Sequence, residues 1–327
     1  MAAEASRDLI SELPLELKVG ILECLPIRDA ARTAVLSTQW NDVWLRLGRL
    51  SFHIDFLLWH IQRCSDKSIV PHKIITYILL HRVEPVKKFR VYLSSSTDPT
   101  LKQQSYLDEW CLHLSTNGIE ELEISYNPHS YHRPYKLPFC IVSCPTIKQL
   151  RLHGFDFPIN APSIFPRLTS LIFSEVVFIH NVDGVVPSIP NLEKLEFKHC
   201  YGIRNFEFRA PKLESLSITG FRPAAESRWL ASHLETIKQL TLSVELLNYY
   251  DIPHSTCSIR RIVNGTASSI TIPNLERLNF FECRGINKLM LSVRLTVHDV
   301  VESRWLTPHL KAIKALWLCG SSLPVRI

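Results

Sequence analysis

The histidines and cysteines between residues 129 and 144 come closest, of all the side chains in this sequence, to a metal-binding set. His129 and His132 precede Cys140 and Cys144, and imidazole nitrogen together with thiolate sulfur suits zinc. The two histidines fall in a polar stretch flanked by prolines, and the neighbouring sequence supplies no framework to hold four ligands together. We therefore expect no metal and no cofactor.

Motifs of other catalytic sites are missing from the sequence as well. A loop that cradles phosphate needs clustered glycines for close backbone approach, but the ten glycines are never closer than 18 residues apart. The chain contains no Gly-x-Ser-x-Gly and no His-Glu-x-x-His, the motifs of serine hydrolases and zinc proteases. We expect a protein that is not itself an enzyme.

Composition and charge narrow the class of partner. Of the 327 residues, 46% are hydrophobic and 21% are charged, which is typical of a folded protein. The net charge of +6 is spread without a run of Lys or Arg, which favours a solvated surface over nucleic-acid binding. Nine irregularly spaced cysteines without Cys-x-x-Cys favour reduced thiols in the cytoplasm or nucleus. The sequence begins without a signal peptide and has no apolar run of membrane-spanning length, so we expect no membrane association.

Apolar residues near the N-terminus recur at the spacing of an α-helix. Three- and four-residue steps would place them on one helical face. Pro14 suits the first turn of that helix, and Pro26 would end it. The residues of this face are Leu13, Leu17, Ile21, Leu22 and Leu25.

Two more short helices are predicted before residue 50. Asp29 could cap the second, and Ser37 could cap a third that carries Trp40 and Trp44 one turn apart. Three short helices cannot bury this many large apolar groups by themselves. They therefore either pack on the rest of the chain or meet a second protein through an apolar patch, and the helical pattern alone leaves both possibilities open.

The same stretch closely resembles the F-box of plant proteins. The resemblance is carried by Asp8-Leu9-Ile10-Ser11-Glu12-Leu13-Pro14, by Leu25-Pro26 and by Ala31-Arg32-Thr33-Ala34-Val35-Leu36-Ser37-Thr38-Gln39-Trp40. It implies that this region docks on the Skp adaptor of a cullin–RING ubiquitin ligase, whose other subunits carry out ubiquitin transfer. The residues that the resemblance places at this contact are Leu13, Pro14, Leu17, Ile21, Leu22, Leu25, Pro26, Leu36, Trp40 and Trp44.

Residues 51–117 are predicted to link the F-box to the rest of the chain and to hold a first, irregular repeat. Apolar alternation over 52–56 predicts a strand. Helical spacing predicts one helix over 74–79 and another over 106–114, which ends at Asn117-Gly118.

A short apolar frame then repeats along the rest of the chain. It consists of an apolar residue, two variable ones, an apolar one, a variable one and an apolar one, and its copies start 21 to 38 residues apart. This frame is typical of leucine-rich repeats, which contribute one strand each to a curved solenoid. A weaker copy at Val86/Phe89/Val91 precedes eight others. Those are Ile119/Leu122/Ile124, Ile147/Leu150/Leu152, Leu168/Leu171/Phe173, Leu192/Leu195/Phe197, Leu213/Leu216/Ile218, Ile237/Leu240/Leu242, Leu275/Leu278/Phe280 and Ile313/Leu316/Leu318.

A longer self-similarity indicates that the C-terminal half is duplicated. The run that begins at Ile189 returns at Ile272, and Glu-Ser-Arg-Trp-Leu around Trp229 returns around Trp305. We expect both tryptophans in the core and Cys200 as a small buried filler.

Taken together, these patterns predict an α+β or α/β solenoid, with a three-helix F-box followed by a curved array of leucine-rich repeats. The predicted domains are 1–50 (F-box), 51–117 (linking helices and irregular repeat) and 118–327 (leucine-rich repeats). The chain is similar to plant F-box/leucine-rich-repeat proteins, many of which end in an FBD domain. We recognise no FBD-like segment after the last repeat in this sequence and therefore expect that repeat to lack a polar cap.

The family resemblance implies a substrate-recognition subunit of a Skp–cullin–F-box ubiquitin ligase that holds an unidentified target on its repeats. An interaction scaffold uncoupled from ubiquitination and a small-molecule-sensing F-box receptor are the alternatives. Strand alternation places the residues between the buried apolar ones on the concave surface, where the target would bind. Those residues are Arg151, His153, Lys194, Glu196, Lys198, Gln239, Thr241, Arg277, Asn279, Phe281 and Trp317.

Overall fold

The computed structural model divides the chain into two compact units, residues 1–147 and 148–327. None of the helices in its described residues is long and apolar enough to span a membrane. The domain boundaries predicted at residues 50 and 117 stay predictions. The structure describes residues 9–56, 59, 70–93, 101–126, 135–157, 165–178, 186, 188–201, 203, 208–220, 233, 235–243, 274, 276–281 and 315–319.

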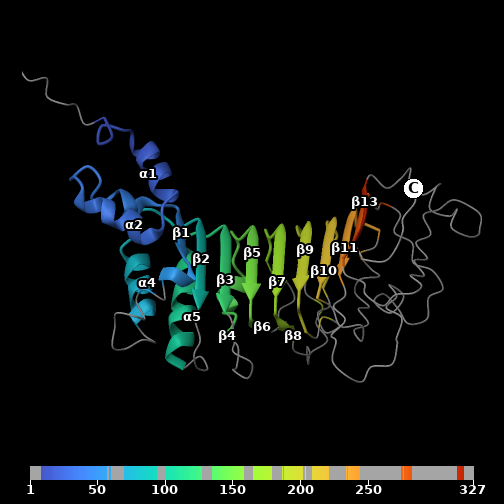
Figure 1. The fold of residues 1–327 in the computed structure, drawn as a ribbon. Coiled ribbons are helices and arrows are strands. Elements are labelled where there is room, and N and C mark those ends of the chain that lie inside the picture. The colour runs from blue at the N-terminus through green and yellow to red at the C-terminus, as the bar shows by residue number, and fades with distance from the viewer. Residues whose placement is uncertain are drawn as a thin grey trace, which may run out of the picture. The chain divides into compact units, whose positions relative to one another are not determined.

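The N-terminal part of the first unit is helical, as its apolar spacing predicts (Figure 1). Prolines set the helix boundaries, because Pro14 and Pro26 are the N-cap residues of the first two helices and cannot donate to a preceding turn. The elements are α1 (Leu15–Glu23), α2 (Ile27–Arg32) and the two 3₁₀ helices η1 (Thr33–Val35) and η2 (Val43–Arg46).

Two of the predicted caps are wrong. Asp29 lies inside α2 and pairs with Arg32 at 3.1 Å, instead of capping the helix. The Ser37 hydroxyl lies 3.3 Å from the Ser11 hydroxyl, and the third helix is the short η2, which contains Trp44 but not Trp40.

In the described remainder of the first unit, three helices accompany three parallel strands of one sheet and a short fourth strand, β4, that lies outside that sheet (Figure 1). Phe89 pairs in register with Leu50 on one side and Leu122 on the other. The predicted strand over 52–56 is wrong, because the strand ends at Phe52 and residues 54–56 are helical. The elements are β1 (Arg49–Phe52), α4 (Val70–Leu80), β2 (Lys88–Leu93), α5 (Leu101–Thr116), β3 (Glu121–Tyr126), β4 (Tyr135–Lys136) and α6 (Phe139–Val142).

The two long helices of this unit confirm the helical patterns over 74–79 and 106–114. They pack together through Trp110, whose indole N–H donates to the Thr76 hydroxyl at 2.7 Å. Gly118 follows α5 with φ of +75°, a conformation that glycine adopts without strain at a helix end.

Seven parallel strands of the second unit lie in one sheet, one strand for each repeat (Figure 1). The register pairs Leu150, Leu171, Leu195, Leu216, Leu240, Leu278 and Leu316 across neighbouring strands. These are the central apolar residues of successive frames, so the predicted solenoid of leucine-rich repeats is confirmed. The strands are β5 (Gln149–His153), β7 (Ser170–Ser174), β9 (Lys194–Lys198), β10 (Ser215–Thr219), β11 (Gln239–Ser243), β12 (Arg277–Phe281) and β13 (Ala315–Cys319).

Phenylalanines fill the core behind this sheet. The Phe173 ring contacts Phe157, Phe178 and Phe197 with centroids 5.0 to 5.7 Å apart, within the range of favourable aromatic pairs. Two short strands beside them, β6 (Phe155–Phe157) and β8 (Val177–Phe178), pair in parallel. Cys200 is buried here, as expected of a small filler. The repeated blocks around Trp229 and Trp305 lie outside the described residues.

The residue after each strand takes a left-handed conformation in four successive repeats. Gly154 and Gly220 occupy this position in two of them, and Glu175 and His199 occupy it in the two between, with φ of 52° and 50°. The His199 ring covers Gly220 so closely that a Cβ on this glycine would lie 2.2 Å from Nδ1.

We expect Gly220→Ala to lower the free energy of unfolding by about 1–3 kcal/mol, since it combines a left-handed alanine with a steric clash. Gly20→Ala is the matched control. Gly20 lies within α1 with nothing near the added methyl group, so this change should stabilise by about 0.5–1 kcal/mol. Urea unfolding of both variants measures the difference, and equal midpoints would contradict the packing of His199 on Gly220.

Candidate protein-interaction surfaces

One face of α1 presents apolar side chains to solvent. Leu17 is 55% exposed and Ile21 is 45% exposed, and Leu25 continues the same row one turn later. Leu36, after η1, is 72% exposed. A row of this kind on a helix is unusual for a surface without a partner and marks a candidate protein-binding site.

The structure divides the ten predicted adaptor contacts into a surface group and a core group. Leu22 is 0% exposed and Trp40 is 5% exposed, so the structure places both side chains among the buried residues of this region, and their contact with an adaptor stays a prediction. Leu22 lies about 100° around the axis of α1 from Ile21, and α1 packs on η2, which contains the buried Val43. Leu13 and Trp44 are half-buried. The exposed members are Pro14, Leu17, Ile21, Leu25, Pro26 and Leu36.

Four exposed apolar residues beside this row did not enter the sequence-based prediction. Leu9 and Ile10 precede α1, Leu15 is its first residue, and Val35 is 86% exposed next to Leu36. Leu9, Ile10 and Val35 belong to the motif segments quoted above, and Leu15 directly follows one of them, so their position in the sequence was a usable signal. Their exposure to solvent could not be predicted from the sequence, because it depends on which side of each short helix the rest of the chain covers.

Polar contacts fix the inner side of α1. Lys18 is buried, and its ammonium lies 5.6 Å from the centroid of the Trp40 ring and 3.5 Å from the Gln39 side-chain oxygen. A cation over an indole face is a favourable contact. This anchoring of Lys18 and Trp40 holds α1 with Leu17 and Ile21 outward.

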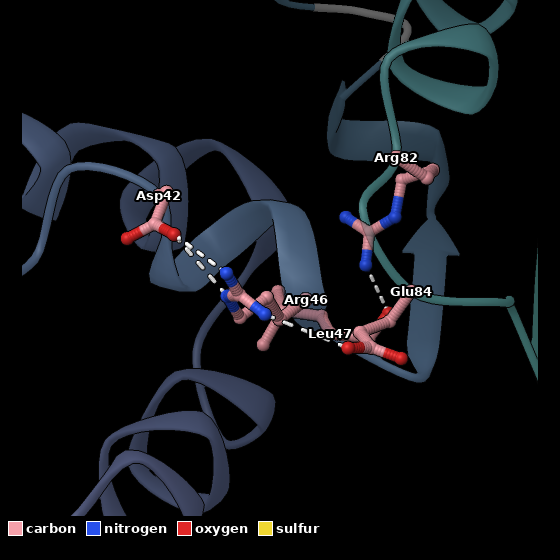
Figure 2. Close-up of polar contacts among 5 residues, drawn as sticks. All are labelled: Asp42, Arg46, Leu47, Arg82 and Glu84. Atoms are coloured by element: carbon pink, nitrogen blue, oxygen red, sulfur yellow. Dashed lines mark hydrogen bonds and ion pairs between the residues drawn. The ribbon is translucent and has the colours of Figure 1, made fainter.

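Arg82 ties the end of η2 to the segment that follows α4 (Figure 2). Its guanidinium donates to the Trp44 carbonyl at 2.7 Å and to the Leu47 carbonyl. Burial lowers the pKa of Arg82 to about 10, so the side chain is still a cation at neutral pH. The contact satisfies two carbonyls at a helix end, where partners are lacking.

Arg46 makes a second, more exposed link in the same place. Its guanidinium lies 3.0 Å from the Asp42 carboxylate and 3.5 Å from that of Glu84 (Figure 2). Asp42 and Arg46 belong to the helical N-terminal part, whereas Glu84 precedes β2. The two arginines therefore join η2 and the residue after it to the segment between α4 and β2.

A cavity of about 420 Å³ lies beside the α1–α2 turn, bordered by β1 and the residues after it. Leu25 and Pro26 form part of its wall, and the Arg28 guanidinium lies 5.5 Å from the centroid of the Trp59 ring there. Acidic, basic and aromatic residues all line it, so the lining favours no single class of ligand.

The predicted target-binding residues lie at alternate positions of the strands in the second unit. Arg151, Lys194, Gln239 and Arg277 are exposed, and His153, Glu196, Lys198 and Thr241 are half-buried. The side chains of Asn279, Phe281 and Trp317 lie outside the described residues, although the register places Asn279 opposite Trp317. We call the outward-facing positions of β5, β7, β9, β10, β11 and β12 the open sheet face.

Ion pairs occupy part of this face. The Lys198 ammonium lies 3.0 Å from the Glu196 carboxylate. At the end of β5, an imidazole nitrogen of His153 lies 3.3 Å from the carboxylate of Glu175. Both are ion pairs at the protein surface, and neither pair contains a nucleophile beside a base.

Within the described part of the chain, no group of three His, Cys, Asp or Glu side chains could hold a metal ion. His129 and His132 lie outside that part. Burial raises the pKa of the Cys200 thiol to about 12, and burial also raises the pKa of Cys111. Thiols of this kind stay protonated at neutral pH and are poor nucleophiles.

Comparisons with known proteins agree with the fold and with the N-terminal motif. The F-box domain family matches residues 10–52. The leucine-rich repeats of the FBD-associated F-box protein At5g56370 match residues 107–291, which is more than half of the chain. The chain belongs to the F-box/leucine-rich-repeat family.

Named relatives of this F-box/leucine-rich-repeat protein come from Arabidopsis thaliana. The F-box/FBD/LRR-repeat protein At1g13570 is 31% identical over 66% of this chain and 50% of its own length. The putative F-box protein At3g58860 is 25% identical over 75% of this chain and 51% of its own length. The chain thus spans about half the length of the curated relatives it matches.

Family membership establishes the general kind of protein. The chain carries an F-box domain, and F-box domains generally bind Skp-type adaptors. F-box/leucine-rich-repeat proteins are generally non-catalytic substrate adaptors.

Proposed function

We propose that this F-box/leucine-rich-repeat protein is a substrate-recognition subunit of a Skp–cullin–F-box ubiquitin ligase. The F-box would dock on a Skp-type adaptor, and the repeats would hold a target protein. The observation that carries the proposal is the exposure to solvent of Leu17 and Ile21 on α1, of Leu25 two residues after it and of Leu36 after η1. These residues coincide with positions at which the F-box motif implies adaptor contact.

The proposed subunit performs no chemistry of its own. Ubiquitin transfer would be carried out by its partners, and the subunit would raise the rate by holding the target near the charged conjugating enzyme. This division of labour agrees with the protonated, buried thiols of Cys111 and Cys200. We place its action in the cytoplasm, the nucleus or both, and propose no role in nucleic-acid or membrane binding.

Co-elution of the full chain with a purified plant Skp-type adaptor tests this proposal. We expect a stoichiometric complex by size-exclusion chromatography that also incorporates cullin and the RING subunit. A well-folded chain that elutes separately from the adaptor would overturn the ligase role. The repeats would then remain as an interaction scaffold.

A further inference from the structure

Two cations on the open sheet face have neutral neighbours on both sides. Lys194 on β9 stands in register between Ser170 of β7 and Ser215 of β10. Arg277 on β12 stands between Gln239 of β11 and Ala315 of β13. Lys194 and Arg277 are exposed, and neither has an ion pair within the described part of the chain.

In the first unit, by contrast, the cations on the sheet are neutralised by carboxylates on the neighbouring strand. There Lys88 lies 2.8 Å from Glu121 and Arg90 lies 2.8 Å from Glu123, and each pair is directly opposite in the register of β2 and β3. Opposite charges at facing positions stabilise a sheet. The second unit lacks this arrangement around Lys194 and Arg277, so their charge is available to a partner.

Few carboxylates compete for these two cations. Glu196 is the one carboxylate among the described outward positions of β5, β7, β9, β10 and β11, and it already pairs with Lys198 at 3.0 Å. Glu193, Glu214 and Glu276 lie one residue before their strands, at the edge of the sheet. Of these, Glu214 pairs with Lys238 at 2.6 Å.

Between the two cations, the outward-facing side chains are polar and most of them are short. Ser215 and Gln239 occupy the same register row, and Ser217 and Thr241 occupy the next. Hydroxyl and amide groups can donate to or accept from a peptide backbone. Serine is also small enough to let a bound segment approach the sheet.

The register fixes the spacing that a ligand must match. Lys194 and Arg277 lie three strands apart, which at ~4.8 Å per strand is about 14 Å. An extended peptide rises ~3.3 Å per residue and returns to the same side every second residue. Two acidic side chains four residues apart would therefore both point at the sheet and lie over the two cations.

From this spacing we infer that the open sheet face binds an extended acidic segment of a protein, with two Asp or Glu residues four positions apart crossing from β9 to β12. The inference deepens the proposed function by giving the chemical class of the target segment. It commits to carboxylates supplied by Asp or Glu.

A peptide array probed with the purified full chain tests the inference. Twelve-residue peptides of Ser and Gly would carry two Glu residues separated by one to eight positions. We expect the signal to be strongest at a separation of four. Lys194→Glu and Arg277→Glu should each weaken it about fivefold and remove the preference for that separation, since each converts an attraction into a repulsion.

Lys212→Glu is the matched control. Lys212 is exposed, but it precedes β10, contacts Asn191 and lies outside the open sheet face. Its signal should stay at the wild-type level. A signal independent of spacing, or an equal loss in Lys212→Glu, would overturn the inference. Binding only when phosphoserine replaces glutamate would also overturn it and assign the face to a phosphorylated segment.

The array requires no adaptor, so its result is independent of the ligase role. A chain that shows the spacing preference but forms no adaptor complex would retain this inference and lose the proposed function. A chain that forms the complex but shows no spacing preference would do the reverse.

Discussion

The Leu17→Glu/Ile21→Glu double variant is expected to lose at least about 100-fold in affinity for a Skp-type adaptor and to keep the melting temperature of the wild type. Both side chains are about half exposed, so charge there costs the isolated protein little. In a complex, each would bury an apolar surface worth ~1.5–3 kcal/mol. A 100-fold change corresponds to about 2.7 kcal/mol, so loss of the two contacts is sufficient. Isothermal titration calorimetry measures the affinity and differential scanning fluorimetry the melting temperature.

Two variants of the same helix separate surface from core. Glu16→Ala changes an exposed polar residue of α1 and should leave both affinity and melting temperature unchanged. Leu22→Ala removes a fully buried side chain and should cost about 2–5 kcal/mol of stability. If the double variant bound the adaptor as tightly as the wild type, the exposed row would not be the docking surface, and the scaffold alternative would gain.

Ile21 and Leu22 differ in solvent exposure, and this difference shows what a helical sequence pattern can and cannot predict. Both residues fit an apolar stripe, and spacing alone placed them on one face. They are neighbours about 100° apart around the axis, and the structure buries one while exposing the other. Which edge of the stripe is covered depends on how η2 and Trp40 pack on α1, and that packing is tertiary information that α1 does not contain.

The register of the strands could be predicted residue by residue, because copies of the repeated frame can be aligned with one another in the sequence. The frame around Leu195 recurs around Leu171 and Leu216, and the structure pairs these three leucines directly. A slip of one residue would expose the whole apolar row. The alternation over 52–56 had no such support from a neighbouring copy, and there the strand ended at Phe52.

Arg82 was beyond the reach of sequence reasoning. Its partners are main-chain carbonyls of Trp44 and Leu47, 38 and 35 residues away, and a carbonyl is present at every position whatever the side chain. An isolated arginine after a helix carries no sign of such a bond. In the structure, this residue nevertheless binds two main-chain carbonyls at the end of η2.

Arg82→Met is expected to lower the free energy of unfolding by about 2–4 kcal/mol. Methionine keeps the apolar stem but removes both donors, and hydrogen bonds to charged groups contribute ~1.5–3 kcal/mol each. Part of that loss is offset, because the guanidinium no longer has to be desolvated, the same burial that lowers the pKa of Arg82 to about 10. Urea unfolding gives the free energy, and hydrogen exchange at the amides of η2 shows whether the loss is local.

Arg46→Met is the matched control for Arg82→Met, because it also removes a guanidinium group close to η2 (Figure 2). The partners of Arg46 are Asp42 and Glu84, whose side chains are about half exposed, and exposed ion pairs contribute at most about 1 kcal/mol. A deficit in Arg82→Met no larger than in Arg46→Met would mean that water replaces the guanidinium at both carbonyls. A larger deficit, together with unchanged adaptor affinity, would identify Arg82 as the residue that holds the F-box helices to β1 and β2. In the proposed ligase, such a variant would still assemble with the adaptor but would hold its target less firmly in place, so ubiquitination should fall while complex formation does not.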